Sequence, residues 1–257
     1  MSPTRKKILI TGASSGLGHT FLTHYASQPH TTIYALDQTP LPPLHVEDAS
    51  AATRIHSHVV DITSVSAVAA VVEKISSSDG VDDAPIDLLI HSAGIRGLVP
   101  KVVREKRGDV GAAEEFSVMD HETMMKTFEV NTWGTFNIIR TFLPMLRRAD
   151  GNSEGAKVVV MSSRMGSVEA NTSGAGYAYR ASKAALNAVV KSFSVDVKDV
   201  TFLLLHPGRV ETGLVEWKEE GAMSAEESLR TCLGIIEGCK SGDSGKFVDR
   251  FGEVIKW

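Results

Sequence analysis

The sequence predicts an α/β fold in which a doubly wound parallel sheet of seven strands is covered by helices on both faces. Two observations carry this prediction. Short runs rich in Val, Ile and Leu alternate with longer segments of helical periodicity along the whole chain of 257 residues. The apolar runs also lack alternating polar positions, which is typical of strands buried on both sides of a parallel sheet. Strands and helices that alternate in this way are joined by right-handed crossovers.

The expected elements follow one another without an internal repeat or a linker, so one domain is expected over residues 1–257. Two signals mark helix starts: Asp120 is placed to cap a long helix, and Ser224 forms a capping box with Glu227. The strands are expected at 7–11, 32–36, 58–61, 86–91, 156–161, 200–206 and 245–248. The helices are expected at 16–27, 64–77, 120–148, 176–196 and 224–238.

Two stretches between these elements carry no periodic pattern. Residues 38–54 contain Pro40, Pro42 and Pro43 and are expected to be irregular. Residues 95–118 include a strongly charged portion. We expect this second stretch to be either a solvated loop or a loop beside the functional site or at a subunit contact.

Composition and charge exclude several classes of protein. The chain has 27 Lys and Arg against 31 Asp and Glu, a net charge of −4, which argues against a broad basic surface for nucleic acid or an anionic membrane. No apolar run approaches the roughly 18 residues that span a membrane, and the N-terminus lacks the apolar region of a secretory signal. We therefore expect a cytoplasmic protein with Cys232 and Cys239 reduced, with no nucleic-acid or membrane partner and no metal site.

A glycine-rich turn follows the first expected strand and opens the first helix. Gly12, Gly16 and Gly18 let the backbone turn tightly and approach a ligand closely, while the helix N-terminus offers free N–H groups to a diphosphate. A tight turn without a ligand would use the same glycines. The position of the turn, between a strand and a helix at the start of an α/β chain, favours a bound nucleotide.

Two acidic residues follow the next expected strands. Asp37 is placed where a carboxylate can accept hydrogen bonds from both hydroxyls of an adenosine ribose. The carboxylate would repel a 2′-phosphate, and Gln38 adds no positive charge, so NAD(H) is favoured and NADP(H) is possible. Asp61, followed by Ile62, could reach the adenine. The alternatives are an ordinary turn residue for Asp37 and a cap of the next helix for Asp61.

A Tyr-x-x-x-Lys pair lies in the expected helix 176–196. Tyr179 and Lys183 are four residues apart and therefore share one helix face. A phenol with a pKa of about 10 is a poor base at neutral pH, so catalysis needs a nearby cation that favours the phenolate. The spacing selects Tyr179 rather than Tyr177 as the partner of Lys183. Taken alone, such a pair most often lies on a helix surface.

Three further polar segments are expected near the same edge of the sheet. Ser162 and Ser163 end the fifth strand, where a hydroxyl could hold a substrate oxygen. The segment 207–212 follows the sixth strand and is either part of the site or a plain turn. Asn131 lies within the expected helix 120–148, where Asn is a mediocre helix former that can bend the chain. A purely structural role is the alternative for Asn131.

Together these residues resemble the short-chain dehydrogenases/reductases, in the compact single-domain branch of that family. The resemblance spans essentially the whole chain. The motifs that carry it are T-G-x-x-x-G-x-G at 11–18, Asp61, Asn131, Ser163, the Tyr179/Lys183 pair and P-G-x-V-x-T at 207–212. Residues 161–167, 177–187 and 244–249 are similar, more narrowly, to the C-factor/sniffer carbonyl reductase group.

The resemblance implies a Rossmann-type fold and an NAD(P)(H)-dependent oxidoreductase that interconverts a secondary alcohol and a ketone. It implies that Tyr179 is the general acid/base, that Lys183 lowers its pKa and holds the nicotinamide ribose, and that Ser163 orients the substrate oxygen. Asn131 would hold a water that connects Lys183 to solvent. The implied cofactor-binding residues are Gly12, Ser14, Ser15, Gly16, Leu17, Gly18, Asp37, Asp61, Ile62, Ser92, Ala93, Gly94, Tyr179, Lys183, Pro207, Gly208, Val210 and Thr212. A homodimer or homotetramer, a small alcohol or carbonyl substrate, and a helical substrate-loop region at 213–240 are also implied.

Three features depart from the pattern of the family. His91 and Ser92 stand where the family commonly has Asn-Asn, so side-chain hydrogen bonds from these positions cannot be assumed. The separation between Ser163 and Tyr179 is a few residues longer than usual, as in the C-factor/sniffer group. Relatives in that group usually carry a basic residue after the second strand, where this chain has Asp37.

Two rival functions compete with an oxidoreductase of this kind. The first is a cofactor-binding signalling or scaffold protein of the same fold, with little catalysis; the intact set of Asn131, Ser163, Tyr179 and Lys183 disfavours it. The second is a sugar-nucleotide epimerase or dehydratase, which needs a larger C-terminal domain than the short segment after Thr212.

Overall fold

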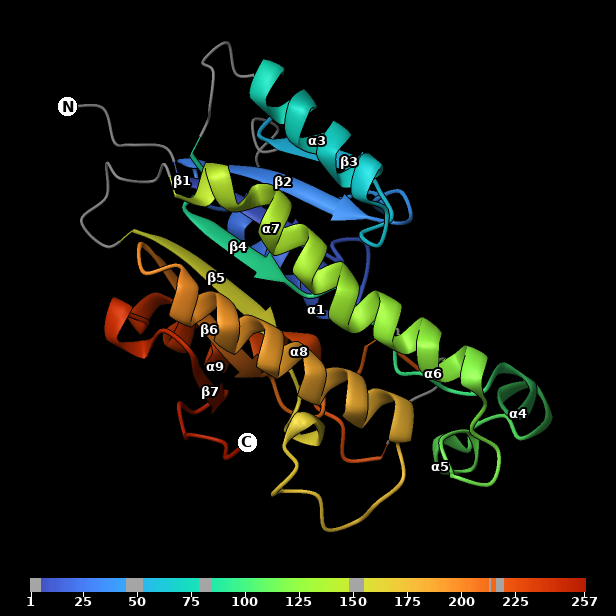
Figure 1. Ribbon diagram of the computed structural model, residues 1–257. Coiled ribbons are helices and arrows are strands. Elements are labelled where there is room, and N and C mark those ends of the chain that lie inside the picture. The colour runs from blue at the N-terminus through green and yellow to red at the C-terminus, as the bar shows by residue number, and fades with distance from the viewer. Residues whose placement is uncertain (1–5, 45–52, 79–84, 148–154, 213, 216–219) are drawn as a thin grey trace.

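The computed structural model describes residues 6–44, 53–78, 85–147, 155–212, 214–215 and 220–257 (Figure 1). Its centre is a fully parallel sheet of seven strands in the order β3-β2-β1-β4-β5-β6-β7. The strands are β1 Lys6–Thr11, β2 Thr31–Asp37, β3 Ile55–Val59, β4 Leu88–His91, β5 Ala156–Met161, β6 Val200–His206 and β7 Lys246–Asp249. The order reverses beside β1, because β2 and β3 lie on one side of it and β4 on the other. Such a switch point leaves a crevice at the carboxyl ends of β1 and β4. The predicted doubly wound fold is confirmed.

Two layers of helices cover the sheet, and each strand contributes side chains to both (Figure 1). Along β1, Ile8 and Ile10 pack with the layer of α1 and α9, whereas Leu9 packs with the layer of α3, α7 and α8. Burial on both sides explains why the strands are apolar throughout. The helices of these layers are α1 Gly16–Ala26, α3 Val65–Ser78, α7 Thr135–Leu146, α8 Tyr177–Asp196 and α9 Ala225–Gly238, and two short 3₁₀ turns are Arg164–Gly166 and Ser241–Asp243.

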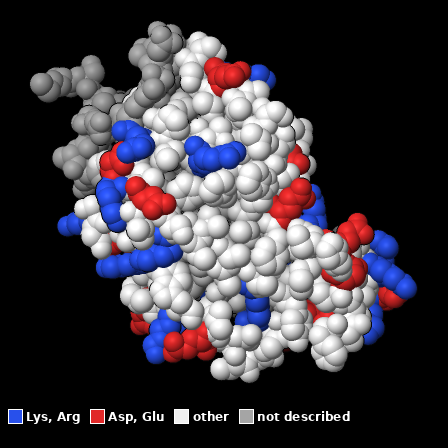
Figure 2. All heavy atoms as spheres, in the orientation of Figure 1, with Lys and Arg blue, Asp and Glu red and all other residues white. Residues whose placement is uncertain are grey.

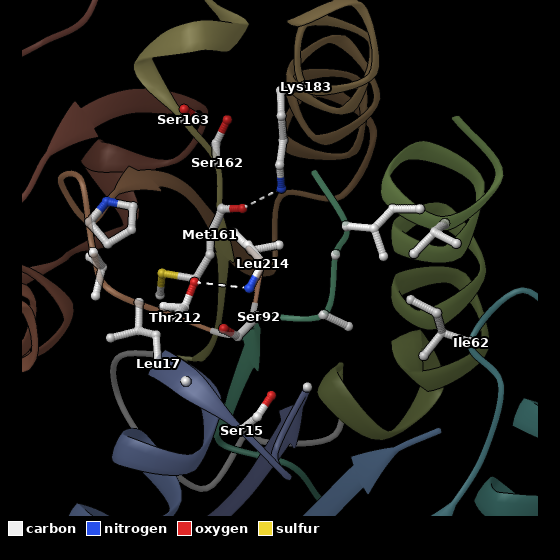
Figure 3. Close-up of a pocket in the computed structure, with 18 of the residues that line it drawn as sticks. Ser15, Leu17, Ile62, Ser92, Met161, Ser162, Ser163, Lys183, Thr212 and Leu214 are labelled. Atoms are coloured by element: carbon white, nitrogen blue, oxygen red, sulfur yellow. Dashed lines mark hydrogen bonds between the residues drawn. The ribbon is translucent and has the colours of Figure 1, made fainter. Parts of the chain in front are cut away.

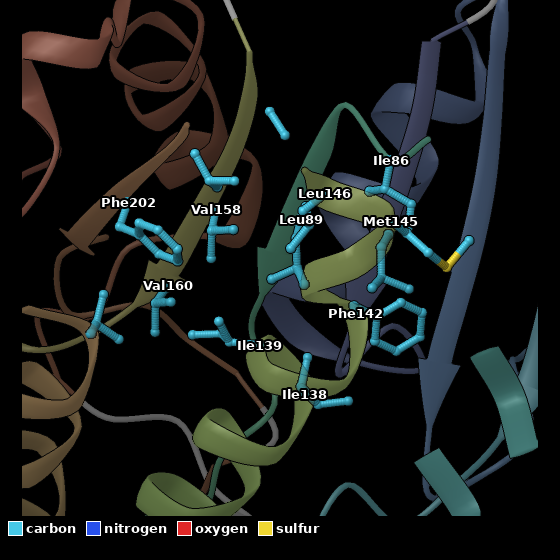
Figure 4. Packing of buried hydrophobic residues seen from close by; sticks show 14 of the residues in the cluster. Ile86, Leu89, Ile138, Ile139, Phe142, Met145, Leu146, Val158, Val160 and Phe202 are labelled. Carbon is cyan, nitrogen blue, oxygen red and sulfur yellow. The ribbon is translucent and has the colours of Figure 1, made fainter. Parts of the chain in front are cut away.

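The larger of the two cores fixes α7 on the sheet (Figure 4). Ile138, Ile139 and Phe142 of α7 are fully buried against apolar side chains of the central strands, among them Val158 and Val160. Each such side chain contributes roughly 1.5–3 kcal/mol on burial. This packing anchors the segment that precedes α7, and that segment reaches the crevice.

The expected helix at 120–148 is interrupted. α6 (His121–Phe128) and α7 are joined by a π-helical turn, Glu129–Gly134, which contains Asn131. A π-turn widens the helix locally and occurs often at functional sites. The prediction of one continuous helix was therefore wrong, although the expected disturbance at Asn131 is present. Residue 148 lies outside the described residues.

The prediction that residues 95–118 are irregular was also wrong. This stretch contains two short helices, α4 (Pro100–Glu105) and α5 (Val110–Ala113), which bury Val102 and Ala113 in a small separate cluster. Helices of six and four residues are too short to leave a periodic pattern in the sequence. Of the other expected loop regions, residues 45–52, 213 and 216–219 lie outside the described part of the chain.

Element ends differ from the predicted ones mainly at the edge of the sheet. The third strand was predicted at 58–61, but β3 pairs with β2 through Ile55–Val59. β3 is an edge strand with mixed exposure, so its polar residues hid it from a search for apolar runs. The predicted cap at Asp120 is confirmed, since Asp120 Oδ1 accepts a hydrogen bond from Thr123 N (2.7 Å). Ser224 also caps its helix, since its Oγ accepts a hydrogen bond from Glu227 N (3.1 Å), which is one of the two bonds of the predicted capping box.

The surface and the cysteines add two observations. On the face shown in Figure 2, Lys and Arg lie interspersed with Asp and Glu. None of the described helices is long and apolar enough to cross a membrane. Cys232 and Cys239 are buried free thiols.

Candidate active site

A cavity of about 490 Å³ lies at the carboxyl edge of the sheet, beside the switch point (Figure 3). The loops after β1, β2, β3, β4, β5 and β6 line it together with α8. Predicted site residues that line the cavity are Gly12, Ser15, Gly16, Leu17, Asp37, Asp61, Ile62, Ser92, Ala93, Gly94, Ser163, Tyr179, Lys183, Pro207, Gly208, Val210 and Thr212. Three predicted residues, Ser14, Gly18 and Asn131, are not part of the lining. Most of the predicted residues therefore converge on one cavity.

Several lining residues were not predicted. They are Val60, Ile95, Lys126, Val130, Met161, His206 and Leu214. Four of them directly adjoin predicted residues in the sequence, namely Val60, Ile95, Met161 and His206. Their position next to a strand end is the sequence feature that could have identified them. Lys126 lies on α6 and Val130 in the π-turn. We did not expect this segment at the cavity, because the sequence predicted one continuous helix there.

The glycine-rich turn can fold this tightly only because its three glycines lack Cβ atoms. Gly12 has φ +69°, and a Cβ on it would lie 2.8 Å from the backbone of Ala93. Gly16 has φ +50°, and a Cβ there would meet the Thr212 side chain at 2.9 Å. Gly18 packs against the carbonyl oxygen of Gly12. Positive φ values and such close approaches favour glycine, so the loop can lie against a ligand and α1 can begin directly behind it.

Asp37 is fixed beside this turn. Its Oδ2 accepts a hydrogen bond from Ser14 N (2.9 Å), and its Oδ1 accepts one from Thr39 N (3.2 Å). Ser14, which does not line the cavity, thus orients the carboxylate that does. This position is more specific than that of an ordinary turn residue, because the carboxylate joins the glycine-rich turn to the end of β2.

Asp61 does not cap the following helix. Its Oδ1 accepts hydrogen bonds from Thr63 N (2.9 Å) and Thr63 Oγ1 (2.8 Å), and the backbone bond is the main reason why the pKa of Asp61 is lowered. Ser64 instead caps α3, since its Oγ accepts a hydrogen bond from Ala67 N (3.2 Å). Asp61 therefore lines the cavity at the end of β3, and the structure does not support its alternative role as a helix cap.

Tyr179 and Lys183 are not a surface pair, because they are only 7% and 4% exposed. Lys183 Nζ donates a hydrogen bond to the carbonyl oxygen of Met161 (2.9 Å), as Figure 3 shows, and burial lowers the pKa of Lys183 to about 8. Burial also raises the pKa of Tyr179 above its ordinary value, whereas the Arg96 guanidinium and a hydrogen bond with Ser163 lower it. Ser163 Oγ accepts a hydrogen bond from Met165 N (3.2 Å).

Asn131 acts on the cavity wall from behind. Its Oδ1 accepts a hydrogen bond from Ile95 N (2.8 Å), while its Nδ2 donates to Ile95 O (2.9 Å) and to Ser182 Oγ (3.0 Å). Gly94 lies between Asn131 and Lys183, because a Cβ on Gly94 would be 3.0 Å from Asn131 Oδ1 and 3.7 Å from Lys183 Nζ. Asn131 therefore holds the lining loop in place from outside the lining.

His91, which replaces the usual Asn of the resembled family, joins three elements in the interior. Thr135 Oγ1 donates its single hydrogen to Asn131 O (2.6 Å), so it accepts a hydrogen bond from His91 Nε2 (2.9 Å). The neutral ring then accepts at Nδ1 from Thr11 Oγ1 (2.8 Å), which itself accepts from Ala93 N (3.4 Å). The chain of hydrogen bonds connects the glycine-rich turn, β4 and the π-turn.

This buried ring is expected to make the folded protein sensitive to acid. Burial, with a smaller effect from Lys183, lowers the pKa of His91 to about 3, whereas an unfolded His has a pKa of about 6.5. The unfolded chain therefore binds more protons between these values, and stability should fall as the pH is lowered through this window, by about 1.4 kcal/mol per pH unit. In urea unfolding at several pH values, the free energy of unfolding should fall less steeply with decreasing pH for His91→Asn than for the unchanged protein. The exposed His30, changed to Asn, serves as the control, and equal slopes for all three proteins would contradict the neutral buried ring.

The sequence is similar to proteins of a known enzyme family. A family model described as short chain dehydrogenase matches residues 6–222. C-signal of Myxococcus xanthus is 38% identical over 177 residues, which cover 67% of this chain and 93% of that protein. The 1-hydroxy-2-glutathionyl-2-methyl-3-butene dehydrogenase of Rhodococcus sp. (strain AD45) is 30% identical over 254 residues, which cover 97% of this chain and 99% of that protein.

Solved structures extend these similarities to the fold. The NADPH-bound carbonyl reductase from chicken fatty liver has a TM-score of 0.80 at 23% identity and covers 99% of both chains. The carbonyl reductase Sniffer of D. melanogaster has a TM-score of 0.78 at 24% identity and covers 99% of this chain and 100% of its own. The similarity to C-signal supports the C-factor side of the narrower resemblance, and the two carbonyl reductases show the shared fold.

Proposed function

Since the chain belongs to the short-chain dehydrogenase/reductase family, whose members are oxidoreductases that use NAD(P)(H), we propose that it interconverts a secondary alcohol and a ketone with Tyr179 as the general acid/base. The observation that carries this proposal is the convergence of Tyr179, Lys183 and Ser163 on one cavity beside the glycine-rich turn. Their burial supports catalysis, because a low-dielectric wall strengthens interactions with a reacting oxygen.

The residues of the cavity fit a dinucleotide. Gly12 and Gly16 let the turn pack tightly against Ala93 and Thr212, where a Cβ would collide, and the N-terminus of α1 behind the turn would offer backbone N–H groups to a diphosphate. Asp37 would hold the adenosine ribose, and Asp61 with Ile62 would lie beside the adenine. The other end would rest against the two loops that follow β4 and β6. When bound, the nicotinamide supplies or accepts a hydride.

The side chains around the substrate oxygen would manage the proton. In reduction, Ser163 and Tyr179 donate hydrogen bonds to the carbonyl oxygen, and the Tyr179 hydroxyl passes its proton to that oxygen as negative charge develops. The backbone N–H of Met165, which donates to Ser163 Oγ, fixes the position of this hydroxyl. Lys183, mostly protonated at neutral pH, stabilises the phenolate that remains. In oxidation the same groups act in reverse.

The test of this proposal is turnover of a panel of ketones, aldehydes and secondary alcohols with NADH, NADPH, NAD⁺ and NADP⁺. The absorbance of the reduced nicotinamide reports the reaction in both directions. Saturable turnover of at least one carbonyl or alcohol supports the proposal. Cofactor binding without turnover of any compound would instead favour a signalling or scaffold role, which the similarity to C-signal also suggests.

We propose further that NAD(H) is preferred, although the chicken carbonyl reductase was solved with NADPH. The Asp37 carboxylate, held by Ser14 N, would face a 2′-phosphate with like charge. Asp37→Ala is therefore expected to lower the ratio of NADPH to NADH dissociation constants by at least about tenfold, because one repulsion of 1.4 kcal/mol corresponds to that factor. Asp37→Asn, which removes the charge but keeps a similar shape, should change the ratio in the same direction. Parallel fluorescence titrations measure the ratio, and an unchanged value in both variants would count against a ribose role for Asp37.

A further inference from the structure

Tyr179 has a second cation beside its ring. The guanidinium carbon of Arg96 lies 4.9 Å from the centre of the Tyr179 ring, nearer than Lys183 Nζ at 5.8 Å. Arg96 comes from the segment after β4, two residues beyond Gly94, so it approaches the ring from a different element than Lys183 does. No feature of the sequence singled out this residue.

The surrounding structure holds the guanidinium in place. Arg96 Nε donates to Glu114 Oε2 (2.9 Å), and Arg96 Nη2 donates to Glu114 Oε1 (3.0 Å). The two side chains are only 19% and 9% exposed, so the pair is largely shielded from solvent. Glu114 is fixed in turn, because its backbone oxygen accepts a hydrogen bond from Gly176 N (3.1 Å) at the start of α8. The two hydrogen bonds between Asn131 and the Ile95 backbone fix the chain next to Arg96.

We propose that the Arg96–Glu114 ion pair sets the acidity of Tyr179, with Arg96 favouring the phenolate and Glu114 both orienting the guanidinium and moderating its charge. This inference rests on the proposed function, in which Tyr179 exchanges a proton with the substrate oxygen. Both members of the pair are positioning residues, since they act on the substrate through Tyr179.

The physical basis is the charge of the ring in its two protonation states. A cation near the face of a neutral ring is attracted weakly, and the attraction grows when the hydroxyl loses its proton and negative charge spreads over the ring. Burial raises the pKa of Tyr179, and the positive charge of Arg96 lowers it. The negative charge of Glu114 raises it again and so cancels part of the effect of Arg96. A bidentate carboxylate also prevents the guanidinium from rotating away from the ring.

Other titratable groups face the same region and are left in place in the test. Lys183 and Arg180 lie on α8 with Tyr179, and Lys126 and His206 line the cavity from α6 and β6. Arg180 itself interacts with both members of the ion pair. The ion pair differs from them in combining a cation and an anion whose removal should have opposite effects.

The experiment titrates Tyr179 directly in the full chain. Tyrosine labelled with ¹³C at Cζ gives one signal for each of the four Tyr residues, and Tyr179→Phe identifies the relevant one. Arg96→Gln is expected to raise the pKa of Tyr179 by about one unit or more, because an opposite charge within about 4–6 Å shifts a pKa by 1–3 units. Glu114→Gln should lower it, because the amide oxygen can still accept a hydrogen bond from Arg96 while the opposing negative charge is removed. Arg104→Gln, which removes an exposed charge on α4, should leave it unchanged.

The opposite signs separate an electrostatic role from a structural one. Loss of packing alone would move Tyr179 in the same direction in both variants, and that result, or no shift in either, overturns the inference. Arg96→Lys keeps the positive charge, so the pKa of Tyr179 should stay close to its value in the unchanged protein. This variant also provides a comparison if Arg96→Gln does not fold. The titration needs no substrate. If Tyr179 titrates as expected but Tyr179→Phe retains turnover, the proposed function fails while the control of acidity stands.

Discussion

Tyr179→Phe is expected to lower kcat by about 10³-fold or more, at the upper part of the 10²–10⁴-fold range for general acid–base catalysis, while the cofactor dissociation constant changes by less than about twofold. The phenyl ring keeps the packing of a side chain that is 7% exposed, so the variant loses the proton donor and little else. Steady-state kinetics with the best carbonyl substrate and a fluorescence titration with NADH measure the two quantities.

Tyr177→Phe is the matched control. Tyr177 is two residues away on the same helix but 43% exposed, and its hydroxyl should be dispensable. A Tyr179→Phe enzyme with normal kcat would refute the assigned acid/base. Equal losses in both variants would point to damage of α8 rather than to loss of a proton donor.

Gly18→Ala should abolish cofactor binding, with an increase of the dissociation constant of more than about 100-fold, and should lower the free energy of unfolding by about 1–3 kcal/mol. The added methyl group would overlap the carbonyl oxygen of Gly12, which is backbone and cannot rotate away. Relief of this overlap requires α1 to move off β1, and the diphosphate cradle would open with it. Titration with NADH and urea unfolding test the two effects.

Gly234→Ala makes the same chemical change in α9, where a Cβ meets no atom within 4 Å. In that exposed helix interior the substitution should stabilise the protein by about 1 kcal/mol, since Ala has the higher helix propensity. Unchanged cofactor affinity in Gly18→Ala would show that the close contact between Gly18 and Gly12 does not shape the binding site.

The parts of the fold that the sequence predicted best are those in which local pattern and final environment agree. Both β5 and β6 have the predicted bounds, because a central strand of a parallel sheet is buried on both faces and so is apolar throughout. The predicted site residues also lie together, since each follows a strand and the carboxyl ends of parallel strands meet at one edge.

The missed features depend on partners far away in the sequence. His91 is bonded to Thr11, 80 residues before it, and to Thr135, 44 residues after it. Likewise, Arg96 acquires its role only when Glu114 and α8 are packed around it. Such pairs leave no periodic signal, and the π-turn at Asn131 is hidden because α6 and α7 together have the pattern of one helix.

The cavity is lined by residues from both helical layers, so a bound ligand would contact both. The glycine-rich turn belongs to the layer of α1 and α9, whereas Tyr179 and Lys183 belong to the layer of α7 and α8, and the two layers meet across the sheet edge. A dinucleotide that reaches from one to the other would act as a tie between two halves of the core. At a free concentration 100 times its dissociation constant it would add about 2.7 kcal/mol to the free energy of unfolding. The cellular level of the cofactor would then help to set how long the protein survives.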